Sequence, residues 1–175
     1  MMQSDITDST QLIAFLQQHD ALAATVGQLA LDKQWQLTTA ESCTGGWVAE
    51  AITAISGSSQ WFETGYVTYS NATKQRLLGV NGRTLATRGA VSAEVVEQMV
   101  QGACEESSAD LGVAISGVAG PGGGSAEKPV GTVWFAWGNR EYQVSEKHHF
   151  EGDRTVIRAQ AVCVALQGFI EHLKR

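Results

Sequence analysis

The chain has 175 residues, 43% of them hydrophobic and 17% charged, which is typical of one folded domain and excludes a disordered chain. Eighteen acidic residues against twelve basic ones give a net charge of −6, which disfavours a large basic surface for nucleic acid. No apolar run approaches the roughly 20 residues that span a bilayer, so neither nucleic acid nor a membrane is expected as a partner.

The cysteines and the N-terminus predict a cytoplasmic protein. Cys43, Cys104 and Cys163 are odd in number and far apart, which fits reduced thiols better than a disulfide scaffold or a zinc site. The first ten residues are polar and lack the basic segment of a signal peptide. The four histidines show no metal-ligand spacing with the cysteines, so no metal is predicted.

In chain order, helices and strands are predicted to alternate. Apolar residues at spacings of three and four predict a helix over residues 10–32, which Asp20 divides into two. There follow a strand at 35–39, a helix at 47–55, a β-rich run at 64–69, and a helix that Ser70 caps and that runs from Asn71 to near Gly79. The remainder comprises a helix capped by Ser92, a buried strand at 111–115, a glycine-rich loop at 117–129, β-rich runs at 131–137 and 141–150, and a helix at 153–173.

This alternation predicts a layered α/β fold, with a mixed sheet covered by helices on both faces. In open sheets of this kind, ligands bind where loops leave the carboxyl ends of strands. The loops after Thr39, Tyr69 and Ile115 are of that type. We therefore expect the functional residues in these three loops.

The segment AESCTGG at 40–46 has the composition of a nucleophile turn. Ser42 lies beside backbone N–H groups freed by Gly45 and Gly46, and the helix behind them adds a positive dipole end. A nucleophile with fixed donors suits acyl transfer, although the same turn could simply hold an anion. Cys43 is a rival nucleophile, but adjacent residues on a turn diverge, and we expect it to pack inward.

Lys74 is the candidate base, because no histidine lies in a comparable loop and a Ser-His-Asp triad is disfavoured. If Ser70 caps the helix, Lys74 leans back toward the helix N-terminus, where the dipole and burial both lower a lysine pKa. A general base requires that shift. Alternatively, Lys74 is a solvated helix residue. Tyr69 could hydrogen-bond to Ser42 or Lys74, stack on a flat ligand, or serve only as a strand residue.

The segment SGVAGPGGGS at 116–125 resembles a phosphate-binding loop, because its glycines let backbone N–H groups converge on an anion. It lacks the Gly-Lys-Ser/Thr ending of a triphosphate loop, which disfavours a kinase or ATPase. Arg154 and Arg158 lie one turn apart at the start of the last helix and suit a phosphate monoester. The alternatives are a flexible surface loop and two solvated arginines.

Five segments together resemble the CinA C-terminal domain family, and more narrowly its stand-alone nicotinamide-nucleotide amidase members: AESCTGG (40–46), GSSQWFETGYVTYSNATK (57–74), GAVS (89–92), SGVAGPGGGSAEKPVGTVWFA (116–136) and GDR (152–154). The resemblance covers roughly residues 20–172. It implies a three-layer α/β/α sandwich, commonly a homodimer. One domain would then span residues 1–175, with residues 1–20 as an N-terminal extension.

The resemblance also implies an activity: hydrolysis of nicotinamide mononucleotide to nicotinic acid mononucleotide and ammonia, in pyridine nucleotide recycling, without a cofactor. By matching motifs, it assigns Ser42 as nucleophile, Lys74 as base and Tyr69 to the catalytic site. Substrate contacts are expected from Thr44, Gly45, Gly46, Ser59, Asn71, Ser116, Gly117, Gly120, Gly122, Gly123 and Arg154. The alternatives are a non-catalytic mononucleotide-binding module and a competence-related interaction protein.

Overall fold

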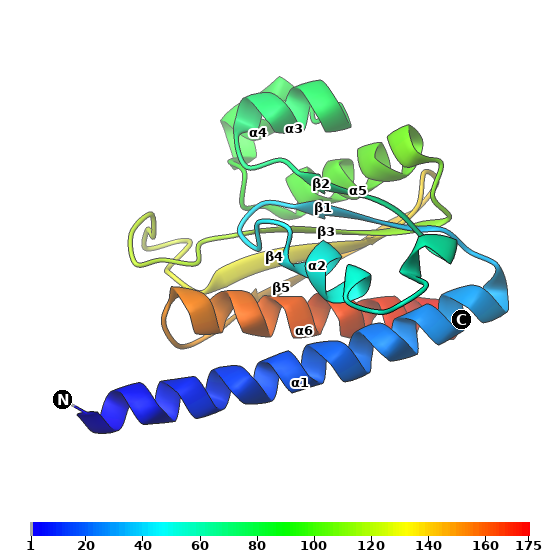
Figure 1. Cartoon of the computed structure of the whole chain (residues 1–175). Helices are drawn as coiled ribbons and strands as arrows, with labels where there is room; N and C mark the ends of the chain where they lie inside the picture. The colour runs from blue at the N-terminus through cyan, green and yellow to red at the C-terminus, as the bar shows by residue number, and fades with distance from the viewer. Residues whose placement is uncertain (1) are drawn as a thin grey trace.

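A five-stranded mixed sheet with the order β2-β1-β3-β4-β5 forms the middle layer of the molecule (Figure 1). The computed structural model describes residues 2–175, with side chains from residue 10 onward. The central strand β1 (Leu37–Glu41) pairs in parallel with β2 (Phe62–Val67) and β3 (Leu111–Gly117). Beyond β3, β4 (Thr132–Gly138) and β5 (Gln143–His149) add antiparallel strands. The predicted mixed α/β sheet is confirmed.

Helices cover both faces of the sheet, as predicted (Figure 1). One face carries α2 (Trp47–Thr53) and α6 (Arg154–Leu173), and the long α1 (Met2–Lys33) runs along α6. The other face carries α3 (Asn71–Leu78), α4 (Gly82–Arg88) and α5 (Ala93–Ser107). A 3-10 turn, η1 (Ser58–Gln60), precedes β2.

Two apolar cores hold the three layers together. Between the sheet and the α1, α2 and α6 side, large buried residues include Trp61, Phe135 and Phe169. Between the sheet and α5, the core is smaller and contains Met99 and Val100. The central strands β1 and β3 are buried along almost their whole length, whereas the edge strand β2 alternates between half-buried and exposed residues. Burial on both faces matches the apolar sequence of β3, whereas the buried threonines and glutamate of β1 form side-chain hydrogen bonds.

Three details differ from the sequence prediction. The predicted break at Asp20 is wrong: α1 is continuous, because Asp20 faces solvent while His19 and Ala23 carry the buried face past it. The helix α4 was not predicted, since seven residues with one buried leucine, Leu85, are too short to show a periodicity. The strand β1 ends at Glu41, two residues later than predicted.

The parallel strands β1, β2 and β3 end at the same edge of the sheet. The loops that follow them, which begin at Ser42, Thr68 and Val118, therefore lie at this edge. No helix in the described part of the chain is both long and apolar enough to cross a membrane.

Candidate active site

Ser42 is the first residue after the central strand and begins the turn that leads into α2. Its backbone N–H donates to Ile115 O at 2.9 Å, which extends the pairing of β1 with β3 by one bond. The residue is buried, with 9% of its surface exposed. The hydroxyl is therefore held at the carboxyl edge of the sheet, with little contact with bulk water.

Lys74 is fully buried and reaches the Ser42 hydroxyl from α3. The Ser70 side chain accepts the N–H of Thr73 and caps this helix, as predicted, so Lys74 is its fourth residue. Lys74 Nζ lies 3.0 Å from Ser42 Oγ, 2.7 Å from Thr68 O and 3.4 Å from Tyr69 O. The alternative of a solvated lysine is therefore wrong.

The surroundings of Lys74 favour an uncharged amine. Desolvation by burial lowers the pKa of Lys74 from its ordinary value of 10.5. The three oxygens that contact Nζ belong to a hydroxyl and two carbonyls, and none belongs to a carboxylate. Because no negative charge compensates the ammonium form, the amine can accept a proton from Ser42.

Cys43 is an unfavourable nucleophile. Its side chain is buried, as expected, and desolvation raises the pKa of its thiol to about 12. Almost no thiolate is present at neutral pH under these conditions.

Two charged side chains that the sequence analysis did not assign to the turn hold it in place. The buried Glu41 carboxylate accepts the N–H groups of Gly46, Val48 and Ala49. Arg158 was expected near a phosphate, but its Nε donates to Cys43 O and its Nη2 to Thr44 O. Arg158 therefore binds the backbone of the turn, and two of its nitrogens are already engaged there.

These bonds change which N–H groups are available to an oxyanion. Gly45 N–H donates to Ser42 O at 3.1 Å and Gly46 N–H donates to the Glu41 carboxylate at 2.9 Å, so both are occupied. The backbone N–H groups of Cys43 and Thr44 donate to no oxygen atom among the described residues. Gly45 and Gly46 instead serve the turn's shape, because both have a positive φ, 65° and 97°.

Arg154 joins the glycine-rich loop to the β2 edge. Its Nη1 donates to Gly120 O at 2.7 Å and its Nη2 lies 3.2 Å from the Tyr69 hydroxyl. Tyr69 is 62% exposed, so its ring is accessible from solvent. The structure thus brings Arg154, Tyr69 and the loop together.

The glycine-rich loop keeps unengaged donors. In the described chain, the N–H groups of Gly120, Gly122 and Gly123 donate to no protein acceptor. Ser116 and Gly117 form the carboxyl end of β3, level with Ser42, and Asn71 is the first residue of α3. These residues therefore lie at the same sheet edge as the Ser42–Lys74 pair.

Ser59 is the exception among the predicted site residues. It is exposed in η1, before the first residue of β2, whereas the site lies beyond the last. The six residues of β2 separate the two ends by roughly 20 Å. Ser59 therefore lies apart from the other predicted site residues of this chain.

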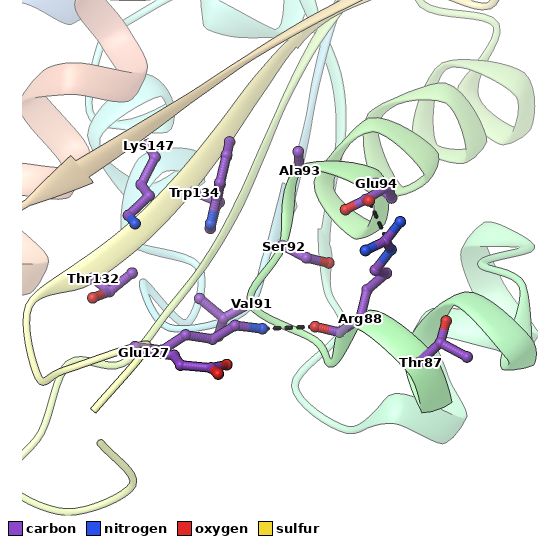
Figure 2. A pocket seen from close by; sticks show the side chains of 11 residues that line it. Thr87, Arg88, Val91, Ser92, Ala93, Glu94, Glu127, Thr132, Trp134 and Lys147 are labelled. Carbon is purple, nitrogen blue, oxygen red and sulfur yellow. Dashed lines mark hydrogen bonds and ion pairs between the residues drawn. The ribbon is translucent and has the colours of Figure 1, made fainter. Parts of the chain in front are cut away.

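A separate cavity of about 500 Å³ lies where α4, α5 and β4 meet, and the predicted site residues do not line it (Figure 2). Lys128 Nζ donates to Arg88 O at its mouth, and Arg88 pairs with Glu94 at 2.9 Å. The described residues contain no group of three or more His, Cys, Asp or Glu side chains placed to hold a metal ion.

Comparisons with known proteins agree with the motifs. A model of the CinA C-terminal domain matches residues 19–173. A Pseudomonas putida protein named nicotinamide-nucleotide amidohydrolase PncC is 56% identical over 150 residues, covering 86% of this chain and 94% of the relative. The Escherichia coli K12 protein of the same name is 54% identical over 147 residues, covering 83% and 89%.

Solved structures show the same fold. The competence damage-inducible protein A of Klebsiella pneumoniae has a TM-score of 0.87 at 40% identity, covering 90% of this chain and 98% of the other. An Agrobacterium tumefaciens competence/damage inducible protein has a TM-score of 0.86 at 41% identity, covering 90% and 96%. The chain belongs to the CinA C-terminal domain family.

Proposed function

We propose that this chain hydrolyses nicotinamide mononucleotide to nicotinic acid mononucleotide and ammonia, as a step of pyridine nucleotide (NAD) recycling. The observation that carries the proposal is the buried contact of 3.0 Å between Lys74 Nζ and Ser42 Oγ. This contact occurs in a chain more than half identical to relatives named for hydrolysis of a nicotinamide nucleotide.

Ser42 and Lys74 would perform the reaction as nucleophile and base. Uncharged Lys74 takes the proton from Ser42 Oγ, which attacks the carboxamide carbon. The N–H groups of Cys43 and Thr44 stabilise the oxyanion. Lys74 then returns its proton to the departing nitrogen, so ammonia leaves and an ester remains on Ser42.

Water completes the cycle through the same base. Lys74 takes a proton from water, the hydroxide attacks the ester carbon, and the proton passes back to Ser42 Oγ. The products are the carboxylic acid and the free enzyme. The cationic pyridinium ring withdraws electrons from the carbonyl carbon, which makes this amide a better electrophile than an ordinary one.

The remaining site residues would bind the rest of the substrate. Arg154 and the unengaged N–H groups of Gly120, Gly122 and Gly123 suit the 5′-phosphate. The exposed Tyr69 ring offers a face for the pyridinium. Ser116, Gly117 and Asn71 complete the proposed contacts at this edge.

We also propose that the protein works as a homodimer in the cytoplasm. The family resemblance supports the dimer. The three cysteines are free and buried, which suits a reducing compartment.

The experiment follows ammonia release by the purified protein from nicotinamide mononucleotide, nicotinamide riboside and nicotinamide. We expect the mononucleotide to have the highest kcat/KM, because only it carries the phosphate. Thermal stabilisation by the mononucleotide without ammonia release would instead favour a non-catalytic binding module. A salt-sensitive shift of DNA in a mobility assay would favour a competence-related role.

A further inference from the structure

The turn between β1 and α2 is bound on its N–H side by one buried carboxylate. Glu41 is fully buried, and its Oε2 accepts the N–H groups of Gly46 and Val48 at 2.9 and 3.1 Å. Its Oε1 accepts the N–H of Ala49 at 2.9 Å and the hydroxyl of Thr39 at 3.3 Å. The first N–H groups of a helix have no partner within the helix, so Glu41 satisfies those of Val48 and Ala49 in α2 and places its charge at the positive dipole end.

The C=O side of the same turn is bound by a cation from a distant helix. Arg158 of α6 donates from Nε to Cys43 O at 3.0 Å and from Nη2 to Thr44 O at 2.9 Å. Its guanidinium lies over the Trp47 ring, 5.2 Å from the centroid. A planar guanidinium donates to the two carbonyls from two nitrogens at a fixed separation, and the single nitrogen of a lysine cannot reproduce that geometry.

The backbone on either side of Ser42 is also fixed. Glu41 O accepts the N–H of Thr68 at 2.9 Å, and Ser42 N–H donates to Ile115 O at 2.9 Å. Within the described turn, the N–H groups of Cys43 and Thr44 donate to no oxygen atom. Hydrogen bonds therefore fix the backbone of the turn but leave the N–H groups of Cys43 and Thr44 available, and these are the groups that an acyl transfer would use.

We propose that Glu41 and Arg158 are positioning residues that clamp the Ser42 turn from opposite sides. The carboxylate holds the N–H groups of Gly46, Val48 and Ala49, and the guanidinium holds the C=O groups of residues 43 and 44. Together they keep Ser42 Oγ at Lys74 Nζ and leave the Cys43 and Thr44 N–H groups open to an oxyanion. The catalytic consequence rests on the proposed function, whereas the clamp itself does not.

Each clamp residue can be replaced by a residue of similar size that lacks part of its hydrogen bonding. In Glu41→Gln, an NH₂ group replaces one acceptor oxygen and must face N–H donors that are already buried. In Arg158→Lys, the charge stays, but one of the two carbonyls loses its donor. Both variants would loosen the turn while leaving the rest of the core unchanged.

The test combines kinetics with amide hydrogen exchange in the full chain. Glu41→Gln and Arg158→Lys are compared with Glu50→Gln, an exposed glutamate of the same helix α2, and Arg83→Lys, an exposed arginine of α4. We expect kcat for nicotinamide mononucleotide to fall about 10- to 100-fold in the two clamp variants, with KM within about twofold of wild type. The control variants should keep wild-type values.

Exchange measured by NMR reports the clamp directly, even if the wild-type protein releases no ammonia. In Glu41→Gln, the amides of Gly46, Val48 and Ala49 should exchange at least about tenfold faster, while the α5 amides of Met99 and Val100 keep their protection. Unchanged exchange at Gly46, Val48 and Ala49 would overturn the clamp. Equal loss of protection in α5 would also overturn it, because the effect would then be global.

The kinetic outcome separates the clamp from a phosphate contact. A rise in KM with kcat unchanged in Arg158→Lys would show that Arg158 binds substrate and would contradict the positioning role. Unchanged kcat in both variants would likewise contradict it. Absence of ammonia release by the wild-type protein would refute the proposed function alone, and the exchange data would still decide the clamp.

Discussion

Lys74 Nζ and Ser42 Oγ lie 3.0 Å apart at the carboxyl edge of the sheet, although the residues come from different structural segments. Lys74 is on α3 and Ser42 follows β1, and both are buried. Burial lowers the pKa of Lys74, and the other oxygens that contact Nζ are backbone carbonyls and not carboxylates. This contact generates most of the predictions below.

Removing either member of the pair should abolish most of the activity. We expect Ser42→Ala and Lys74→Met each to lower ammonia release from nicotinamide mononucleotide by at least about 10³-fold, since nucleophile and base act as a unit. Cys43→Ala keeps the backbone donors and should retain most of the activity, because the thiol pKa is raised to about 12. Loss of activity in Cys43→Ala alone would reverse the assignment of the nucleophile.

The pH dependence of kcat/KM should report the titration of Lys74. The base must be uncharged, and burial lowers its pKa below 10.5. Activity should therefore rise with pH through this lowered pKa and fall about tenfold per pH unit on the acid side. The limb should vanish from the residual activity of Lys74→Met. A limb that persists unchanged in that variant would assign the titration to another group.

Stability should depend on the same titration, with a defined sign. Between the lowered pKa of folded Lys74 and 10.5 in the unfolded chain, the unfolded state binds more protons. The free energy of unfolding of the wild type should therefore increase with pH relative to Lys74→Met across this window. Urea denaturation of both proteins at a series of pH values measures the difference. A difference independent of pH would show that Lys74 titrates normally when folded.

The close packing of α3 on α5 should matter for both stability and activity. A Cβ added at Gly102 would clash with the backbone carbonyl of Leu78, the last residue of the helix that carries Lys74. We expect Gly102→Ala to destabilise the protein by about 1–3 kcal/mol and to lower kcat by displacing α3. Gln101→Ala, next to Gly102 on α5, should change the free energy of unfolding by less than about 0.5 kcal/mol. Urea denaturation and ammonia-release assays on both variants measure these effects. Wild-type stability and kcat in Gly102→Ala would contradict the close packing of α3 on α5.

Local signals predicted the direction in which Lys74 leans, but they left open whether its amine is buried or solvated. The cap at Ser70 sets the start of α3, and four residues of helical geometry turn Lys74 back toward the strand ends. The order of elements, except α4, and the glycine-rich loop were also predicted from periodicity and composition. These features depend on neighbours within a few residues of one another.

The rest of the site depends on contacts between distant segments. Arg158 meets the Ser42 turn across 115 positions of the chain, and no local pattern distinguishes that contact from a phosphate contact. Glu41 was assumed to lie outside the strand, so its inward side chain was not expected. Ser59 was assigned to the site by its motif, but the length of β2 places it at the opposite edge.

The most direct test is to search for the covalent intermediate on Ser42. The protein is mixed with nicotinamide mononucleotide and quenched in acid within milliseconds to seconds. The tryptic peptide that spans residues 34–74 is then fragmented in a mass spectrometer. An adduct on Ser42 with the mass of the substrate less ammonia, absent from Ser42→Ala, is the expected result. An adduct on Cys43, or burst release of ammonia without any adduct on this peptide, would contradict attack by Ser42.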